Sequence, residues 1–334
     1  YLIQSVGFVP NASRTHFLSR SQPPYFSLML DLLFETTNDE KIYIQYHDTL
    51  EKEYAFWMNG EEWLENNSSV KRVAKTQNGD ILNRYYDAEN APRPESYLID
   101  IEDSENAETE FYRNIRSACE SGWDFSSRWF ADGEHIQTIE TLNIAEVDLN
   151  SLLWHLEKTL AKSSVLLNLA DKENYFTERA ARRRQMIDIY FWDENTECYK
   201  DYHLKKHKNT PSEHIAALYP LFLGLADQKQ AESVAKHIAE KFLYQGGLVT
   251  TTKKSGQQWD LPNAWAPYQW LGFKAMKNYG FDDLAEKIKN NWCGNVERVY
   301  GNTGKLMEKY NALDTETIAG GGEYPNQDGF GWTN

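Results

Sequence analysis

The chain has 334 residues, 41% of them hydrophobic, which is enough for one large core or two ordinary domains and excludes a disordered chain. Its 35 Lys and Arg residues against 50 Asp and Glu residues give a formal net charge of −15. Nucleic acids and anionic membrane surfaces bind positively charged proteins, so the charge argues against both as partners. A neutral substrate remains compatible with it.

Three cysteines, Cys119, Cys198 and Cys293, lie far apart in the sequence. An odd number of widely spaced cysteines predicts neither a disulfide framework nor a metal-binding knuckle, and it favours a reducing compartment. We therefore favour a cytoplasmic location over a periplasmic or secreted one. No apolar run approaches the length of about 20 residues that a membrane-spanning helix needs, so we expect no membrane segment.

Helical periodicity recurs along the chain, whereas the alternation typical of strands is scarce. The expected helices cover, in chain order, about residues 24–34, 40–58, 107–118, 149–160, 174–191, 212–226, 234–242, 264–279 and 284–296. The clearest apolar stripe comprises Leu149, Leu152, Leu153, Leu156 and Leu160. An all-α chain with this organisation is expected to form one domain over residues 1–334.

Longer segments rich in Gly, Pro, Asn and Asp separate these helices, at 83–105, 119–133, 245–263 and 301–334. Short links on one side and long loops on the other suggest antiparallel helix pairs around a centre, with the functional residues on the loop face.

The loop at 120–129 carries Asp124 between Trp123 and Phe125. Hydrolysis of a glycosidic bond needs one carboxylic acid to protonate the leaving oxygen and a second carboxylate, and apolar surroundings raise the pKa of an acid towards that role. The alternative is that Asp124 caps the turn that follows, since Asp and Ser both favour helix starts.

The C-terminal stretch carries Glu308, and it carries Glu323 directly after three glycines. Consecutive glycines are costly to order and often persist where the backbone bends sharply or approaches a ligand. A mobile lid is one interpretation, and a flexible surface loop with two solvated Glu residues is the other.

Three further loop segments combine residue types that suit sugar recognition. Trp259 belongs to a segment with a second indole, a carboxylate and amides, which can stack on a sugar face and bind its hydroxyls. Arg20 and Arg93 each lie beside prolines that stiffen the loop, and rigid guanidinium groups suit hydroxyl recognition. Surface ion pairs are the alternative for both arginines.

Metal and nucleotide chemistry find little support in the sequence. His203 and His207 could share a helix face, but the lysines between and beside them oppose a cation, and no HExxH pattern is present. No glycine-rich phosphate loop occurs either. We expect no metal and no cofactor, and we interpret the basic residues Arg179, Arg182, Arg183 and Arg184 as a solvated, salt-bridged helix face.

Taken together, these segments resemble the trehalase family of glycoside hydrolases, and the resemblance extends from about Gly7 to the last residue. The segments that carry it occur in the family's order: Gly7-Phe8-Val9-Pro10-Asn11, Arg20-Ser21-Gln22-Pro23-Pro24, Arg93-Pro94-Glu95-Ser96, Ser121-Gly122-Trp123-Asp124-Phe125-Ser126-Ser127-Arg128-Trp129, Gln258-Trp259-Asp260 and Gly321-Gly322-Glu323-Tyr324-Pro325.

The resemblance implies an (α/α)6 toroid that hydrolyses α,α-trehalose to two glucose molecules with inversion of configuration. Asp124 matches the family's general acid and Glu308 its general base, which in an inverting enzyme are expected to lie about 6.5–9.5 Å apart. The residues that match sugar-binding positions are Asn11, Arg20, Ser21, Gln22, Arg93, Pro94, Glu95, Gly122, Trp259 and Glu323. The expected partner is the sugar alone, bound by a monomer.

The sequence also departs from the family pattern. The family's first signature, a Pro-Gly-Gly-Arg-Phe stretch followed by Tyr-Trp-Asp, is absent upstream of Asn11, as is a third pocket arginine, so we expect a toroid that lacks its first helices. Ala264 stands where the family usually has Gly, which is tolerable unless the position needs a positive φ. A non-catalytic trehalose-binding fragment and a hydrolase of another α-glucoside remain the alternatives.

Overall fold

The structure is a computed structural model that describes residues 1–107, 109–317, 324–329 and 331–333. The chain divides into two compact units, each built from several stretches of sequence. Unit 1 comprises Tyr1–Gly122, Glu140–Phe191 and Asp201–Asn209, and unit 2 comprises Trp123–Ile139, Trp192–Lys200 and Thr210–Asn334. One catalytic domain over residues 1–334 stays a prediction.

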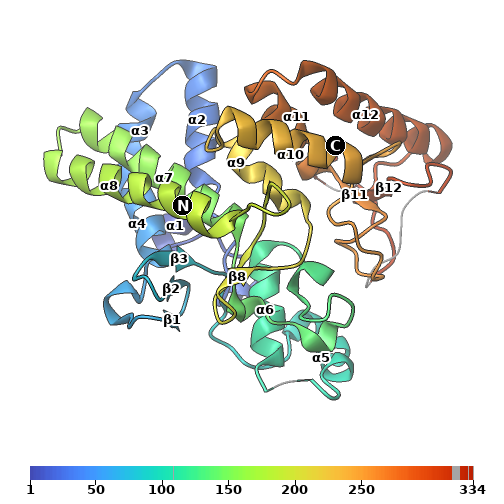
Figure 1. Cartoon of the computed structure of the whole chain (residues 1–334), viewed down its shortest axis with the longest axis horizontal. Helices are drawn as coiled ribbons and strands as arrows, with labels where there is room; N and C mark the ends of the chain where they lie inside the picture. The colour runs from blue at the N-terminus through green and yellow to red at the C-terminus, as the bar shows by residue number, and fades with distance from the viewer. Residues whose placement is uncertain (108, 318–323, 330, 334) are drawn as a thin grey trace. The chain divides into compact units, whose positions relative to one another are not determined.

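Unit 1 contains eight α-helices among its described residues. They are α1 (Leu2–Val6), α2 (Phe26–Thr37), α3 (Lys41–Gln45), α4 (His47–Trp57), α5 (Tyr97–Asp103), α6 (Phe111–Ser121), α7 (Val147–Leu166) and α8 (Ala170–Met186), which continues into a π-helical turn at Ile187–Phe191. Helices α7 and α8 lie side by side, as Figure 1 shows.

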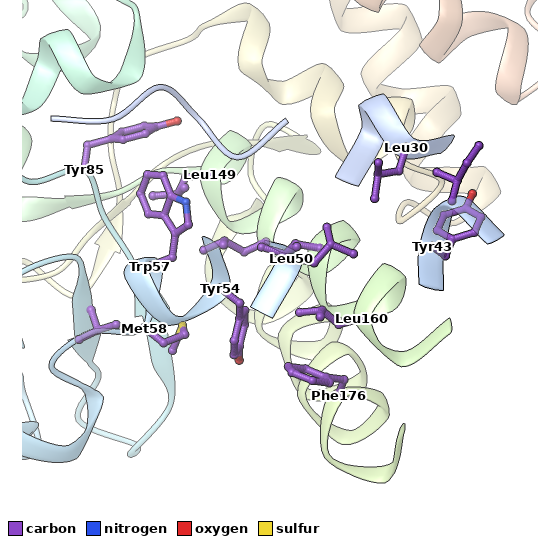
Figure 2. Close-up of a cluster of buried hydrophobic side chains, with 14 residues drawn as sticks. Leu30, Tyr43, Leu50, Tyr54, Trp57, Met58, Tyr85, Leu149, Leu160 and Phe176 are labelled. Carbon is purple, nitrogen blue, oxygen red and sulfur yellow. The ribbon is translucent and has the colours of Figure 1, made fainter. Parts of the chain in front are cut away.

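The core of unit 1 forms where α7 packs against α2, α3, α4 and α8. The predicted leucine stripe supplies its centre: all five leucines from Leu149 to Leu160 are buried, with 0% of their surface exposed. Figure 2 shows Leu149 and Leu160 among the aromatic side chains Tyr43, Tyr54, Trp57 and Phe176, which come from α3, α4 and α8. Removal of this apolar surface from water is the main stabilising contribution to the unit.

Two small antiparallel sheets complete unit 1. Strands β1 (Ser68–Val70), β2 (Val73–Lys75) and β3 (Ile81–Asn83) form a meander in which Ser68 is opposite Lys75 and Lys75 is opposite Ile81. The second sheet has the order β4 (Ile144–Ala145), β7 (Tyr202–His203) and β8 (Lys208–Asn209).

Unit 2 contains four α-helices among its described residues: α9 (Tyr219–Phe222), α10 (Gln228–Lys241), α11 (Ala266–Asn278) and α12 (Asp282–Thr303). A capping box starts α10, in which Asp227 and Gln230 bind each other's backbone N–H groups. Helix α11 packs along α12.

The strands of unit 2 are short antiparallel pairs. They are β5 (Trp192–Asp193) with β6 (Cys198–Tyr199), β9 (Leu243–Tyr244) with β10 (Gly247–Leu248), and β11 (Asn263–Trp265) with β12 (Lys309–Asn311). Ala264 lies in the middle of β11 opposite Tyr310 and is not among the residues with a positive φ. The methyl group at this position is therefore accommodated by an extended strand, as expected.

Each predicted helical segment overlaps a helix of the structure, although 40–58 is divided into α3 and α4. The prediction missed α1, which has five residues, and α5, which lies within the segment 83–105 that was predicted as a loop. His203 and His207 do not share a helix face, because they lie on β7 and in the turn that follows it. Proximity in sequence gave no sign of that hairpin.

The basic residues of α8 differ from one another in exposure and in their partners, which their spacing did not indicate. Arg182 is exposed and pairs with Asp80, which agrees with a salt-bridged surface. Arg183 is 2% exposed and donates to Glu157 on α7 and to Asn83 and Asn150. The interpretation of a solvated face was therefore wrong for Arg183, because its partners come from distant parts of the sequence.

Two exclusions from the sequence can be compared with the structure. No disulfide joins the three cysteines, all of which lie within the described residues. In the same described part of the chain, no helix combines the length and the apolar character that crossing a bilayer requires.

Candidate active site

The loop that carries Asp124 is fixed in unit 2 by a buried carboxylate from another loop. Asp260 is fully buried and accepts hydrogen bonds from the Ser126 hydroxyl at 2.7 Å, the Ser127 backbone N–H at 2.8 Å and the Thr251 hydroxyl at 2.7 Å. Because its oxygens are used by the protein, Asp260 is a structural residue that holds the two loops together.

Asp124 itself lies just before this anchor, with the flanking Trp123 and Phe125 each 1% exposed. Its backbone carbonyl accepts a hydrogen bond from the Gln258 side chain. The residue that caps the following 3₁₀ helix, Ser127–Trp129, is Ser126, whose hydroxyl accepts from the Arg128 N–H. The interpretation of Asp124 as a helix cap was therefore wrong.

Three indole rings of unit 2 stack beside the Asp124 loop. Trp259 lies 3.9 Å from Trp265 between ring centroids and 5.5 Å from Trp123, with interplanar angles of 2° and 15°. Trp259 is 5% exposed. Since neighbouring indoles use its ring surface, Trp259 offers a ligand little beyond a ring edge, and its place in the pocket wall stays a prediction.

Glu308 is positioned by the pairing of β12 with β11. Lys309, the first residue of β12, is opposite Trp265, so Glu308 lies one residue before the paired segment. Its side chain is buried, and Oε2 accepts from the Lys309 ammonium at 3.0 Å. The Glu308 carbonyl accepts from the Trp332 indole N–H at 3.0 Å, which holds the backbone from the other side.

Tyr324 completes the surroundings of Glu308, since its hydroxyl donates to Oε1 at 2.7 Å. The pKa of this hydroxyl is raised well above its ordinary value, first by burial, and then by its hydrogen bond to Glu308 and the charges of Glu308 and Asp124. A hydrogen bond from Gln258 has the opposite, smaller effect. Tyr324 therefore remains a hydrogen-bond donor at neutral pH.

Gln258 and Tyr324 connect the two candidate catalytic segments. Gln258 binds the Asp124 carbonyl and the Tyr324 hydroxyl, and Tyr324 in turn binds Glu308. Neither residue was singled out individually in the sequence, although both belong to the segments that carry the family resemblance. Their contribution was not predictable, because it depends on three loops meeting in space.

Unit 1 holds most of the residues predicted to bind sugar, on two adjoining stretches of chain. Around a bridge between Pro10 and Ser21, the Asn11 N–H donates to the Arg20 carbonyl and the Gln22 N–H to the Val9 carbonyl. The Gln22 side-chain amide donates to the Asn11 carbonyl at 2.7 Å. The Asn11 amide donates to the Cys119 carbonyl at 3.0 Å. This arrangement ties both side chains to the end of α6.

Ser21 donates two hydrogen bonds to a buried carboxylate. Its backbone N–H and its hydroxyl donate to Oε1 of Glu120 at 2.8 and 3.0 Å. Glu120 is fully buried and also accepts from the Arg72 guanidinium and from the Tyr86 N–H at 2.8 Å. The sequence gave no indication of this cluster, whose members lie up to 99 positions apart.

Arg20 is fully buried and pairs with Glu95 through one nitrogen, Nη2. Its Nε and Nη1 atoms are also buried and find no hydrogen-bond acceptor among the described residues. Buried donors without a protein partner are expected to bind a ligand or water. The prediction of Arg20 and Glu95 as sugar-binding residues therefore fits this geometry.

Arg93 has a different environment. Its Nε and Nη2 atoms donate to both oxygens of Asp100, a fully buried residue of α5, with the shortest contact at 2.6 Å. Its Nη1 contacts the Cys119 sulfur at 3.5 Å. Pro94 starts the 3₁₀ turn that leads to α5, and Gly122 ends α6 with φ +83°, a conformation that favours glycine.

Glu323 and the three glycines before it lie outside the described residues. Elsewhere in the described residues, the side chains of His47, Asp48 and Glu51 have the spacing of a metal site, with possible ligand atoms within 4.8 Å of one another. The ammonium group of Lys172 is 2.7 Å from Glu51, however, and opposes a cation at that position.

Comparison with known proteins gives the family of this chain. The trehalase family model matches residues 1–334. The chain belongs to the trehalase family. The periplasmic trehalases of Salmonella paratyphi B and Salmonella typhimurium are each 44% identical to it over 338 residues. These matches cover all of this chain but 59% of each relative, so the chain spans about three fifths of their length.

Solved structures agree on the fold. The neutral trehalase of Saccharomyces cerevisiae superposes with a TM-score of 0.75 at 23% identity, over 95% of this chain and 63% of that one. A mannosylglycerate hydrolase of Thermus thermophilus, in complex with glucose, superposes with a TM-score of 0.60 at 16% identity, over 94% and 74%. These neighbours belong to the (α/α)6 toroid class, and the predicted fold class of this trehalase-family chain is confirmed.

Proposed function

We propose that the protein hydrolyses α,α-trehalose to two glucose molecules with inversion of configuration. The observation that carries the proposal is the match to the trehalase family over the whole chain, with relatives named trehalase at 44% identity. The environment of Glu308 is independent support, because this buried carboxylate faces a small set of polar side chains connected to Asp124.

Asp124 is the proposed general acid and Glu308 the proposed general base. Asp124 gives its proton to the bridging oxygen as the bond from the anomeric carbon to that oxygen breaks. Glu308 takes a proton from a water molecule whose oxygen attacks the same carbon from the opposite face of the ring. One glucose is therefore released as the β anomer and the other as the α anomer.

Glu308 is suited to the base role by its two donors. The Lys309 ammonium and the Tyr324 hydroxyl stabilise a charged carboxylate and hold its orientation. A carboxylate has about four lone-pair positions, so these two contacts leave capacity to accept a proton from water. Retention of configuration would instead need a second carboxylate that attacks the sugar directly and lies about 5 Å from the general acid.

Two buried groups with unused hydrogen-bonding capacity support sugar binding. Gln258 is 2% exposed, and its Oε1 has no donor among the described residues. Arg20 offers two buried N–H groups in the same condition. Sugar hydroxyls both donate and accept hydrogen bonds, so they can satisfy each of these atoms.

The two Salmonella relatives are named periplasmic trehalases, so we propose a periplasmic location in place of the cytoplasmic one favoured from the cysteines. The cysteine argument was weak because a chain without disulfides is compatible with either compartment. A monomer stays a prediction.

The direct test is proton NMR of the purified protein with trehalose, recorded early enough to resolve the first-formed anomers. Equal initial α- and β-glucose signals would support the proposal, whereas α-glucose alone would contradict inversion. Maltose serves as the comparison substrate, and faster cleavage of maltose would contradict the assignment of trehalose. No glucose from protein shown to be folded by circular dichroism would contradict catalysis by these 334 residues.

A further inference from the structure

A polar pocket in unit 1 has no part in the proposed hydrolysis. It has a volume of about 440 Å³, within the usual range of small-molecule sites, and it is lined by residues of the β1–β3 meander, the start of α6 and the β7–β8 hairpin. None of its lining residues is among those predicted to bind trehalose or to catalyse its hydrolysis.

Three cations line this pocket in a protein of net charge −15: Lys75, Arg84 and Lys205. Among the described residues, none of the three has a carboxylate within ion-pair distance. The pocket's own carboxylate, Glu110, pairs with Arg113, which lies outside the lining. The lining therefore holds three cations that form no direct ion pair with a carboxylate of the described residues.

Arg84 is the most constrained of these cations. Its Nε donates to the Lys71 carbonyl at 2.9 Å and its Nη1 to the Leu142 carbonyl, so neutral acceptors fix the guanidinium at the pocket wall. Burial lowers the pKa of Arg84 to about 10. The charges of Glu146 and Tyr86 oppose that change, and the charge of Arg113 adds to it by a smaller amount. A buried cation of this kind is stabilised by an anion.

Unused hydroxyl groups lie beside these cations. Tyr202 is 9% exposed and Ser69 is partly buried, and neither hydroxyl has a hydrogen-bond partner among the described residues. The meander places Lys75 opposite Ser68 on the neighbouring strand, next to Ser69. Amide side chains of Asn114 and Asn143 complete the polar wall.

We propose that this pocket binds a sugar monophosphate, with the phosphate on Lys75, Arg84 and Lys205 and the sugar hydroxyls on Tyr202 and Ser69. A guanidinium and two ammonium groups match a phosphate dianion, since charge-assisted hydrogen bonds are the strong ones. The pocket also exceeds what a bare phosphate fills, and its remaining wall offers donors and acceptors that suit a polyol.

The test is isothermal titration calorimetry of the protein with glucose 6-phosphate, inorganic phosphate and glucose at physiological salt. Glucose 6-phosphate is expected to bind about tenfold or more tightly than either fragment, because it satisfies both parts of the pocket. The double variant Lys75→Gln with Lys205→Gln should weaken this binding about tenfold or more.

The matched control is Lys229→Gln with Lys236→Gln, two exposed lysines of α10 in unit 2, which changes the net charge equally. It should change the affinity less than about twofold, because neither lysine lines the pocket and salt screens exposed charges. Equal affinity in the pocket variant and the control would overturn the proposal, as would the absence of any heat from glucose 6-phosphate.

Equal binding of inorganic phosphate and glucose 6-phosphate would overturn the assignment of a sugar. If the double lysine variant does not fold, Tyr202→Phe takes its place as the test of the pocket, since it removes one hydroxyl without changing the charge. It should weaken the binding of glucose 6-phosphate several-fold and leave the binding of inorganic phosphate unchanged. These measurements involve no turnover, so their outcome is independent of whether the protein hydrolyses trehalose.

Discussion

The surroundings of Glu120 in unit 1 and of Glu308 in unit 2 use the same side chain in two different ways. Both carboxylates are buried, with 0% and 3% of their surface exposed, and each binds a cation. Glu120 accepts from two backbone N–H groups, a serine hydroxyl and a guanidinium. Glu308 accepts from one ammonium and one tyrosine hydroxyl.

The number of hydrogen-bond donors around a buried carboxylate indicates whether it stabilises the fold or is available for chemistry. The oxygens of Glu120 are saturated by groups that cannot move without unfolding, so this residue joins three parts of unit 1. Glu308 has two donors that orient its carboxylate, and it keeps free acceptor capacity to bind a water. Glu53 on α4 is a third case: it is 2% exposed, and its Oε2 has no partner among the described residues.

The largest effect is expected from Glu308→Gln. Loss of the proton acceptor should lower kcat for trehalose about 10²- to 10⁴-fold, measured as initial glucose release. The amide oxygen still accepts from Lys309, so the far-ultraviolet circular dichroism spectrum should be unchanged. Glu316→Gln, an exposed change of the same type, is the control, and a fully active Glu308→Gln variant would remove this residue from the base role.

Glu120→Gln should destabilise the fold. The substitution leaves the Arg72 guanidinium buried without a charged partner, which typically costs about 3–5 kcal/mol of the free energy of unfolding. Urea denaturation followed by circular dichroism measures this change, with Glu89→Gln as the exposed control. A stable variant with reduced turnover would reverse the distinction drawn between Glu120 and Glu308.

Glu53→Gln should make stability less dependent on pH. Burial raises the pKa of Glu53 to about 8, above its value of 4.5 when unfolded. The folded state therefore holds a proton that the unfolded state has released between about pH 4.5 and 8, so stability falls as pH rises through that window. The variant should match the parent near pH 4 and exceed it by about 3 kcal/mol near pH 7.

Urea denaturation at a series of pH values tests this prediction, and Glu62→Gln, an exposed residue, is its control. Parallel pH curves for the parent protein and Glu53→Gln would show that Glu53 is charged in the fold.

The smallest effect is expected from Tyr324→Phe. It removes one of the two donors to Glu308, and a hydrogen bond to a charged group contributes about 1.5–3 kcal/mol, so kcat should fall roughly ten- to hundredfold. Urea denaturation should show little change in stability. Tyr300→Phe on the exposed face of α12 is the matched control, and equal rates for the two variants would exclude a role for Tyr324.

The sequence predicted the helices better than it predicted the roles of charged residues. Leu149 and Leu160 reveal their burial through spacing alone, because helical geometry is local. Arg182 and Arg183 are neighbours of identical type, yet one is exposed and one is buried with Glu157. Which of them turns inward depends on a carboxylate one helix away, and local patterns carry no information about it.

The candidate site shows the same limit. The family resemblance predicted Asp124, Glu308 and Arg20 by position, and their roles stay predictions. It did not distinguish Arg93, whose guanidinium is bound by Asp100, from Arg20, which keeps unused donors. Gln258 and Tyr324 could not be recognised as partners of these residues from the sequence. Their contribution depends on contacts between separate loops, which the residue types alone do not predict.

The pairing of β11 with β12 constrains how this protein can change its length. Successive side chains along a strand point to opposite faces, so a one-residue shift in the pairing that moved Glu308 into the place of Lys309 would put it opposite Trp265. A basic group would then be replaced by an acidic one beside Trp265. Insertions and deletions are therefore tolerable in the turn after Asn311 but not between Glu308 and Asn311, where the spacing of three residues is as important as their identity.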